Sequence, residues 1–366
     1  MSELLARMKK NSTIKETSML AESRFFTKKD MISTPIPALN VALSGRLDGG
    51  LTPGLTLFCG NSKHFKSFFC LILAKAYMDK YPESIMVFYD CEFGTPESYF
   101  DSLNMDKSRI LHTPIMNMEE FKLDAIKHLE NINKGDKIIF LVDSLGNMSS
   151  KKEIDDAKDG KSVTDMSRAK QMKSIFRMIT PYLVKFDIPM VAVNHIYMET
   201  GMFPKAVVSG GTGVYLSADN IYIIGRQQEK EGTEVSGYNF IINVEKSRHV
   251  REKSKIPITV KFEGGISTWS GLLEMALESG HVIKPSNGWY SKVGMSSGEI
   301  QEKKYRIKDT DTKEFWLPIL SDKTFLSWVR ERYTLATGQL LTDESITAEL
   351  DKVVDDDIEA ELENVE

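Results

Sequence analysis

A glycine-opened loop that closes on lysine and serine lies early in the chain. Residues 60–67 read Gly-Asn-Ser-Lys-His-Phe-Lys-Ser and stand between an apolar segment, 55–59, and a helical stretch expected to run through Ala76. This is the layout of a phosphate-binding loop, in which main-chain N–H groups and a helix N-terminus surround the phosphates. The spacing predicts that the Lys66 ammonium reaches the β- and γ-phosphate oxygens and that the Ser67 hydroxyl binds Mg²⁺. The nucleotide-binding residues expected here are Gly60, Asn61, Ser62, Lys63, His64, Phe65, Lys66 and Ser67.

The residue before Lys66 departs from the general phosphate-loop pattern. The motif has glycine there, whereas this chain has Phe65. Phenylalanine tolerates a positive φ angle poorly, so the turn is expected to be built differently or to carry strain. Taken alone, the segment also fits an ordinary basic helix start.

Two later segments place carboxylates at the ends of expected strands. The run 137–143 begins with Lys137, continues with apolar residues and ends in Asp143, and the run 88–93 contains Asp90 and Glu92. The carboxyl ends of parallel strands meet at one edge of a sheet, where a phosphate loop also lies. Asp143 is then expected to hold Mg²⁺, directly or through water. A carboxylate of the other run can orient and deprotonate an attacking water; we favour Glu92, although spacing alone does not separate it from Asp90.

Short apolar segments rich in β-branched and aromatic residues alternate with helical stretches between Thr34 and Phe262. Strands that are apolar throughout are buried on both faces, as in a parallel sheet covered by helices. A helix is expected over 118–132, where Phe121, Ala125 and Leu129 share one stripe. The pattern predicts an α/β fold, a P-loop core with a mostly parallel central sheet flanked by helices. The strands expected on this basis are 55–59, 85–89, 138–142, 188–193 and 221–224.

The other segments are arranged around a core that we expect to span 31–265. Residues 1–30 read as a short helix followed by an arm, too thin to bury a core of their own. Two long segments, 146–165 and 196–214, interrupt the core and are expected to be structureless functional loops. A small C-terminal lobe rich in tryptophan, in which we find no motif, is expected over 266–342.

The charge distribution and composition of the chain limit the kinds of partner and the cellular compartment that we expect for it. Residues 343–366 contain eleven acidic residues and one lysine, so this tail carries −10 and residues 1–342 carry +5, against a net charge of −5. Such a disordered acidic tail either solvates the protein or competes with nucleic acid for a basic site. The longest apolar run, 68–74, is about a third of the roughly 20 residues that cross a bilayer, and the N-terminus lacks a signal-peptide core. Three cysteines without metal-ligand spacing favour a reducing cytosol.

Taken together, these motifs resemble the RecA family of recombinases and, within it, the UvsX-like recombinases of T-even phages. The similarity extends over most of the chain, from the phosphate loop through the Asp143 strand to a strand ending in Asn194-His195 before a glycine-rich segment. The Phe65 departure is itself a mark of the phage branch. The segments that carry the resemblance are 34–40, 60–67, 142–147, 193–195, 209–213 and 243–248.

The resemblance implies roles for residues at the nucleotide site. Glu92 resembles the catalytic glutamate of the family, and Tyr99 stands where the family stacks an aromatic ring on adenine. His195 occupies the position where bacterial RecA has a glutamine that senses the γ-phosphate. Lys246 and Arg248 resemble the cations that reach across a subunit interface to the neighbour's ATP, as an arginine finger does. Tyr99 can instead be an aromatic residue of the core, and Lys246 and Arg248 can instead be two surface cations at a strand end.

The two long segments match the DNA-binding loops of the family. Glycines let main-chain amides approach phosphates, and an apolar side chain can insert between the bases of a stretched strand. Taken singly, each such residue is more often a solvated loop residue than a DNA ligand. The DNA-binding residues implied by the resemblance are Arg168, Lys170, Tyr197, Met202, Phe203, Lys205, Gly210 and Gly211.

The function implied is that of a DNA-dependent ATPase, with ATP and Mg²⁺ as ligands. Such a protein forms a helical filament on single-stranded DNA and catalyses homologous pairing and strand exchange in recombination, repair and replication. Its implied partners are single-stranded DNA, homologous duplex DNA, other copies bound through the N-terminal arm, and single-strand-binding and mediator proteins, with no membrane among them. Its implied place is the cytoplasm of a phage-infected bacterium.

Two alternatives remain at this point. A RecA-fold ring helicase shares the nucleotide site, although thirty-odd residues before the core are too few for the additional domain that such helicases carry. A non-hydrolysing, ATP-gated DNA-binding scaffold or mediator is the other, if Phe65 has abolished hydrolysis.

Overall fold

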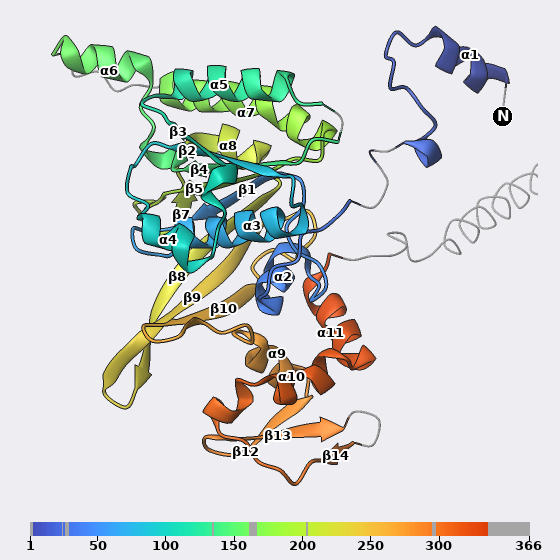
Figure 1. The fold of residues 1–366 in the computed structure, drawn as a ribbon, viewed down its shortest axis with the longest axis vertical. Coiled ribbons are helices and arrows are strands. Elements are labelled where there is room, and N and C mark those ends of the chain that lie inside the picture. Colours follow the sequence, from blue (N-terminus) through green and yellow to red (C-terminus); the bar gives the residue numbers. More distant parts are fainter. Residues whose placement is uncertain are drawn as a thin grey trace, which may run out of the picture.

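A central sheet runs through the computed structural model, which describes residues 3–23, 25, 29–133, 135–160, 167–202, 204–294 and 298–335. Its strand order is β11-β10-β9-β8-β1-β5-β4-β2-β3 (Figure 1). Neighbouring strands from β3 to β8 are parallel, and those from β8 to β11 are antiparallel, so the expected α/β fold with a mostly parallel sheet is confirmed. The strands are β1 (Gly54–Cys59), β2 (Ile85–Asp90), β3 (Ile110–Pro114), β4 (Ile138–Asp143), β5 (Pro189–Asn194), β8 (Asn220–Glu231), β9 (Glu234–Lys246), β10 (Lys255–Lys261) and β11 (Gly265–Ile266).

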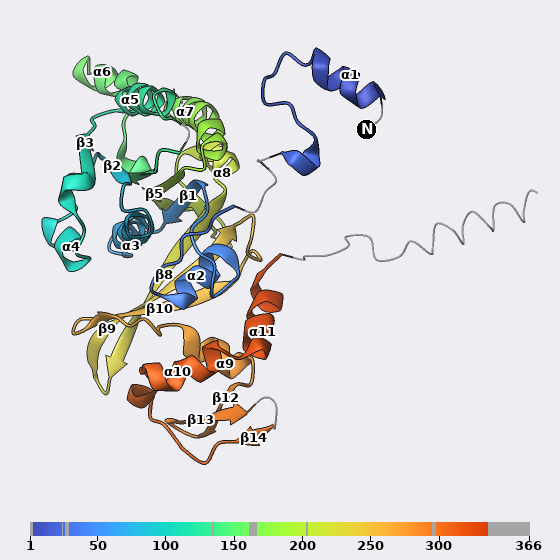
Figure 2. The same cartoon turned by 45° about the vertical axis from the view of Figure 1, so that its right-hand side comes forward.

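Helices cover both faces of this sheet. Figure 2 shows α5, α7 and α8 on one side of the strands and α3 on the other. Because side chains alternate along a strand, Phe58 of β1 packs in the cluster on the α3 face, whereas Leu57 packs in the opposite cluster. Every residue of β1, β4 and β5 is buried, which explains why these segments are apolar throughout. The helices of this core are α2 (Pro37–Ser44), α3 (Lys66–Lys80), α4 (Glu97–Ser102), α5 (Met118–Glu130), α6 (Lys151–Lys158), α7 (Ser167–Lys185) and α8 (Gly211–Ser217).

The parallel register aligns the ends of the strands that carry the candidate chemistry. Cys59 of β1 pairs with Asn194 of β5, and Asp90 of β2 pairs with Asp143 of β4. The phosphate loop, Glu92 and His195 all follow these residues directly. We call this side of the sheet the carboxyl edge and the opposite side the amino edge.

The expected elements can be compared with the observed ones. All five expected strands are present, and the last of them continues as the long strand β8, which β9 follows in an antiparallel hairpin. The helix after the phosphate loop reaches Lys80 rather than Ala76, and the expected 118–132 helix ends at Glu130. Strand β3 was not expected, because it is a largely exposed edge strand without the apolar run of the others.

The expectation that 146–165 and 196–214 lack regular structure is wrong for their described parts. In the first, α6 begins at a capping box formed by Ser150 and Glu153. In the second, β6 (Ile196–Met198) and β7 (Ala206–Val208) pair as an antiparallel hairpin before α8. A solvent-exposed helix and a short surface hairpin need little apolar surface. The polar sequences of these two segments therefore did not exclude regular secondary structure. Residues 161–166 and Phe203 lie outside the described residues.

Smaller parts flank the core at both chain ends. Helix α1 (Glu3–Asn11) buries none of its side chains and stands apart from the sheet in Figures 1 and 2. After β10, a lobe lies at the far end of the molecule, and its Phe315 belongs to the same apolar cluster as Leu39 of α2. The lobe comprises α9 (Leu272–Glu278), β12 (Val282–Ser286), β13 (Trp289–Gly294), β14 (Glu299–Ile300), α10 (Lys313–Leu320) and α11 (Lys323–Tyr333). Short 3₁₀ turns are η1 (Leu20–Glu22), η2 (Lys107–Arg109), η3 (Leu145–Asn147) and η4 (Ile307–Thr310).

The helices of the described chain include none that is both long and apolar enough to cross a membrane. The acidic tail, 343–366, lies outside the described residues.

Candidate active site

The phosphate loop connects the end of β1 to the start of α3, as the sequence predicts. Its Phe65 is the residue at which a strained or different turn was expected. The backbone of Phe65 has φ 61° and ψ 17°, so it adopts the left-handed conformation for which the general motif uses glycine. The turn is therefore kept, and its conformational cost must be offset by packing.

Aromatic packing holds Phe65 in this conformation. Its ring stacks on Phe240 of β9, with centroids 5.0 Å apart and an interplanar angle of 18°. It also contacts Phe68 and Phe69 at centroid distances of 4.6 and 5.6 Å. Such pairs contribute roughly 0.5–1.5 kcal/mol each beyond area burial, which is comparable to the cost of one left-handed residue.

Strand β8 anchors the middle of the loop. The His64 ring nitrogen Nδ1 lies 2.6 Å from the carbonyl oxygen of Ile224, and Arg226 donates to the carbonyl of Lys63 at 3.2 Å. His64 therefore supports the frame of the loop through β8. The side chains of Asn61, Ser62 and Lys63 are exposed.

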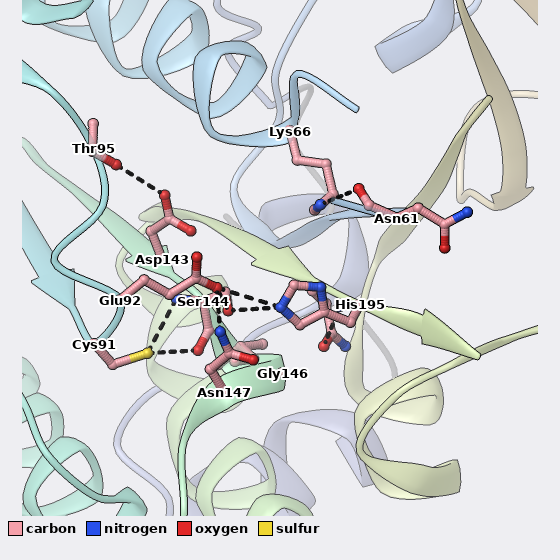
Figure 3. Close-up of polar contacts among 12 residues, drawn as sticks. Asn61, Lys66, Cys91, Glu92, Thr95, Asp143, Ser144, Gly146, Asn147 and His195 are labelled. Carbon is pink, nitrogen blue, oxygen red and sulfur yellow. Dashed lines mark hydrogen bonds and ion pairs between the residues drawn. The ribbon is translucent and has the colours of Figure 1, made fainter. Parts of the chain in front are cut away.

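Lys66 is a buried cation with unused hydrogen-bonding capacity. The residue is 6% exposed, and its ammonium donates to the main-chain carbonyl of Asn61 at 2.7 Å (Figure 3). That oxygen is its only acceptor among the described residues, whereas an ammonium offers three donors. Burial lowers the pKa of Lys66, and the negative charges of Glu92 and Asp143 oppose this effect. The site thus favours an anionic ligand that accepts the remaining hydrogen bonds.

Asp143 and Ser67 form an oxygen-rich corner beside Lys66. Asp143 Oδ2 accepts a hydrogen bond from the Thr95 hydroxyl at 3.2 Å, and its buried Oδ1 has no partner in the described part of the chain. Burial raises the pKa of Asp143, and the nearby Ser67 hydroxyl opposes this rise. A buried carboxylate oxygen without a partner, next to a hydroxyl, suits Mg²⁺, which prefers oxygen ligands and commonly takes few from the protein. Ser67 and Asp143 therefore fit as Mg²⁺ ligands.

Three donors converge on one oxygen of the Glu92 carboxylate. Glu92 Oε1 accepts from the Ser144 hydroxyl, from Asn147 Nδ2 at 2.8 Å and from His195 Nε2 at 3.3 Å (Figure 3). The pKa of Glu92 is lowered, and the hydrogen bond from His195 contributes most to this shift. The hydrogen bond from Ser144 and the positive charge of Lys66 also lower the pKa, whereas burial raises it. Glu92 is therefore held ionised, which is the form that accepts a proton.

Asp90, the alternative to Glu92, has a different set of partners. Its Oδ1 accepts the main-chain N–H groups of Glu92 at 3.1 Å and Phe93 at 2.8 Å, and its Oδ2 lies 3.2 Å from His112 Nε2. The residue is 5% exposed. Asp90 thus builds the turn that presents Glu92, and the geometry favours Glu92 as the reactive carboxylate.

His195 approaches Glu92 closely because the opposing residue is a glycine. A Cβ atom on Gly146 would lie 2.1 Å from His195 Cδ2. His195 Nε2 also lies 3.4 Å from the Ser144 hydroxyl oxygen. Tyr99, on α4, is half-buried with its ring edge-on to Phe68 of α3 at 5.2 Å, so it lies beside the helix that the phosphate loop starts.

Lys246 and Arg248 lie away from the phosphate loop of their own chain. Strand β9 is antiparallel to β8, so Lys246 pairs with Ile221 near the start of β8, at the amino edge. The Lys246 ammonium donates to the carbonyls of Tyr215 and Leu216 at 2.8 and 3.1 Å, and burial lowers its pKa. Arg248 pairs with Asp219 at 2.7 Å, yet its side chain is 69% exposed.

The residues implied in DNA binding divide into exposed and engaged side chains. Lys170, Tyr197, Met202 and Lys205 are exposed. Arg168 instead directs its guanidinium to main-chain carbonyls, at 3.1 Å to Met148 and 3.5 Å to Leu145, with a further close contact to Gly146. Its predicted role toward DNA stays a prediction, and in this structure it supports the segment after Asp143.

Two glycines in the same group shape the backbone. Gly210 and Gly211 have φ angles of 96° and 76° and form the start of α8. The left-handed conformation of both residues explains why glycine is needed there.

Comparisons with known proteins agree with this arrangement. The chain is 45% identical over 363 residues to the "Recombination and repair protein" of Enterobacteria phage T4, an alignment that covers 98% of this chain and 92% of that protein. It is 25% identical over 218 residues to Protein RecA of Synechococcus sp. (strain CC9902) and 26% identical over 218 residues to Protein RecA of Prochlorococcus marinus (strain MIT 9303). Each of these alignments covers 59% of this chain and 56% of RecA. A family model described as "Bacteriophage T4, Recombination and repair protein, C-terminal domain" matches residues 269–329.

The sheet, the phosphate loop and these similarities define a recombinase of the RecA class. Within that class, the chain belongs to the UvsX-like recombinases, whose work is recombination and repair. The resemblance stated from the sequence is therefore confirmed.

Sequence reasoning missed several contributors to the site. Ser144 and Asn147 contact Glu92, and their position within four residues after Asp143 was the available signal. Phe240 has no local signal, because only the fold brings β9 to Phe65. Sequence reasoning also found no motif in the C-terminal lobe, most of which the family model matches.

Proposed function

We propose that this recombinase is a DNA-dependent ATPase that assembles as a helical filament on single-stranded DNA and catalyses homologous pairing and strand exchange. The observation that carries the proposal is the convergence of Lys66, Asp143 and Glu92 at the carboxyl edge, where their charges act on one another. A cation, a metal-binding carboxylate and an ionised carboxylate of low pKa meet the requirements of phosphoryl transfer to water.

Each residue has a defined part in this proposal. The main-chain N–H groups of 60–67 and the start of α3 hold the phosphates of ATP, and Lys66 compensates their charge. Ser67 and Asp143 hold Mg²⁺, which when bound neutralises developing phosphate charge. Glu92 orients the attacking water and takes its proton, and His195 responds to the γ-phosphate. We assign Tyr99 to the adenine ring.

Assembly would complete the site from a second copy. Lys246 and Arg248 lie at the amino edge, so they cannot serve the phosphate loop of their own chain. Arg248 pairs with Asp219, yet its side chain is 69% exposed, so the outer part of its guanidinium can reach the phosphates of a neighbour. Charge supplied across an interface makes hydrolysis depend on filament formation.

DNA binding in this proposal is independent of sequence. Cations such as Lys170 and Lys205 contact the backbone, and exposed apolar groups such as Met202 pack against bases. Base pairing between strands reads homology. Homologous duplex DNA and single-strand-binding and mediator proteins complete the proposed partners, in the cytoplasm of a phage-infected bacterium.

One experiment tests the proposal as a whole. ATP hydrolysis is measured as phosphate release while single-stranded DNA is titrated, and the product is imaged by electron microscopy. We expect DNA-stimulated turnover and extended filaments. Closed rings would instead identify a ring helicase, and DNA binding without turnover would identify an ATP-gated scaffold.

Removing residues 1–25 is expected to block filament growth while leaving the core folded. No residue of α1 is buried in the part of the chain that the structure describes, which suits an element that packs on a neighbouring copy. Light scattering with single-stranded DNA reports growth, and circular dichroism reports the fold. Unimpaired growth of the shortened chain would exclude residues 1–25 from the polymerisation element.

Removing residues 343–366 is expected to strengthen DNA binding or to raise its salt tolerance. The segment carries eleven acidic residues, which would compete with DNA phosphates for basic groups. The measurement is a salt titration of DNA affinity for both chains. If the salt titrations of the full-length and shortened chains coincide, the tail does not compete with DNA, and its role is limited to solubility.

A further inference from the structure

A short segment connects the candidate catalytic carboxylate to helix α7. Residues 144–148, which we call the bridge segment, follow the Mg²⁺ ligand Asp143 and contain η3. On one side, Ser144 and Asn147 donate to Glu92 Oε1. On the other side, Arg168 at the start of α7 donates to the carbonyls of Leu145, Gly146 and Met148. The bridge segment is thus held from both sides.

The donors act on the two oxygens of Glu92 unequally. Ser144, Asn147 and His195 all reach Oε1, and none of the residues that the structure describes donates to Oε2. A carboxylate fixed through one oxygen presents the lone pairs of the other in a defined direction. A general base needs this arrangement, because its efficiency depends on geometry before pKa.

Asn147 serves no visible packing purpose in this arrangement. The residue is exposed, and its side-chain amide makes its one described hydrogen bond to Glu92, at 2.8 Å. Ser144 is buried, and His195 is itself the proposed γ-phosphate sensor. Asn147 is therefore the donor to Glu92 that can be removed with least disturbance to the rest of the site. Figure 3 shows its amide pointing at the Glu92 carboxylate from the side opposite Asp143.

We infer that Asn147 is a positioning residue for Glu92, and that Arg168 holds the bridge segment in the place from which Asn147 acts. This inference rests on the proposed function, since it assumes that Glu92 is the base in ATP hydrolysis. Asn147 restrains Oε1 and so directs Oε2 toward the attacking water. Arg168 acts on this geometry through main-chain carbonyls, independently of any DNA contact.

The test compares full-length variants in steady-state ATP hydrolysis with and without single-stranded DNA. Replacing Asn147 with alanine is expected to lower kcat about tenfold, the effect of one lost hydrogen bond to a charged group, and to leave KM for ATP within about twofold. Losing a donor to the ionised carboxylate also raises the pKa of Glu92, so the acid limb of kcat/KM moves to higher pH. Asn147→Gln keeps the amide and is expected to recover part of the loss.

A matched control and a double variant separate positioning from structural damage. Asn131→Ala removes another exposed amide that donates to one oxygen, the Lys127 carbonyl, and is expected to leave kcat unchanged. In a Glu92→Gln background, Asn147→Ala is expected to add no further loss, because both changes act on the same step. Additive losses, an unmoved acid limb, or equal activity of the alanine and glutamine variants would overturn the inference.

Arg168→Ala tests the second half of the inference. If Arg168 holds the bridge segment, turnover without DNA falls in this variant as it does in Asn147→Ala. If Arg168 acts only on DNA, turnover without DNA is unchanged and the supporting role is excluded. A wild-type chain with no turnover in either condition would overturn the proposed function, whereas turnover that is insensitive to Asn147→Ala would overturn this inference alone.

Discussion

Replacing Lys66 with alanine is expected to lower ATP turnover at least a hundredfold, with and without DNA. The Lys66 ammonium is a buried cation at the carboxyl edge, and among the described residues it donates one hydrogen bond, to the Asn61 carbonyl. Its remaining donors are available to the phosphates, where charge develops during transfer to water. Removing a single preorganised donor of this kind costs about 10²–10³ in rate in other enzymes. Phosphate release measures the effect.

The same substitution is not expected to destabilise the nucleotide-free protein. Burial lowers the pKa of Lys66, so the charged ammonium is disfavoured in the absence of nucleotide, and a bound anion offsets this effect. Thermal unfolding without nucleotide should therefore be close to that of the unmodified chain, whereas added ATP should raise its midpoint less than it does in the unmodified chain. Lys75→Ala, which removes a lysine paired with Asp79 farther along the same helix, is the control and should keep normal turnover. Near-normal turnover of Lys66→Ala would refute the phosphate role.

Replacing Glu92 with glutamine is expected to lower kcat by about 10²–10⁴ while nucleotide binding persists. Glutamine has the same size and retains a carbonyl oxygen for the Ser144 and Asn147 donors, so the geometry of the site is largely preserved. The lost property is the negative charge that accepts the proton. Filaments of this variant should also remain on DNA longer, because hydrolysis precedes release. Phosphate release and filament lifetime by light scattering are the two measurements.

The pH dependence gives an independent view of the same residue. His195 and Ser144 lower the pKa of Glu92, so the base stays ionised as pH falls and is lost only when pH drops through this lowered value. The acid limb of activity assigned to Glu92 should therefore lie below that of an ordinary glutamate and be absent in Glu92→Gln. If Asp90→Asn abolished turnover while Glu92→Gln did not, the base would be Asp90. That result would contradict the turn-forming role that we assign to Asp90 from its hydrogen bonds to the Glu92 and Phe93 main chain.

The location of the candidate site was largely predictable from sequence because it depends on spacing along the chain. Lys66 and Ser67 stand at the start of a helix after a buried strand, and Asp143 ends another, so a parallel sheet must bring them to one edge. The expectation for Phe65 was open between a different turn and a strained one. Only the fold decided it, by placing Phe240 of a distant strand against the ring while the backbone kept its positive φ angle.

Tertiary structure also decided what each polar side chain is used for. Glu92 and Asp90 are equivalent in spacing, yet one meets His195 and the other closes a turn. Arg168, for which a DNA contact stays a prediction, holds main-chain carbonyls of the segment after Asp143 in this structure. Residue type and spacing by themselves determined which reactive groups this protein has and at which edge of the sheet they gather, because strand ends and helix starts are local properties. The partner of each group depended on contacts between segments far apart in the chain, and only the packed sheet and its helices set those contacts.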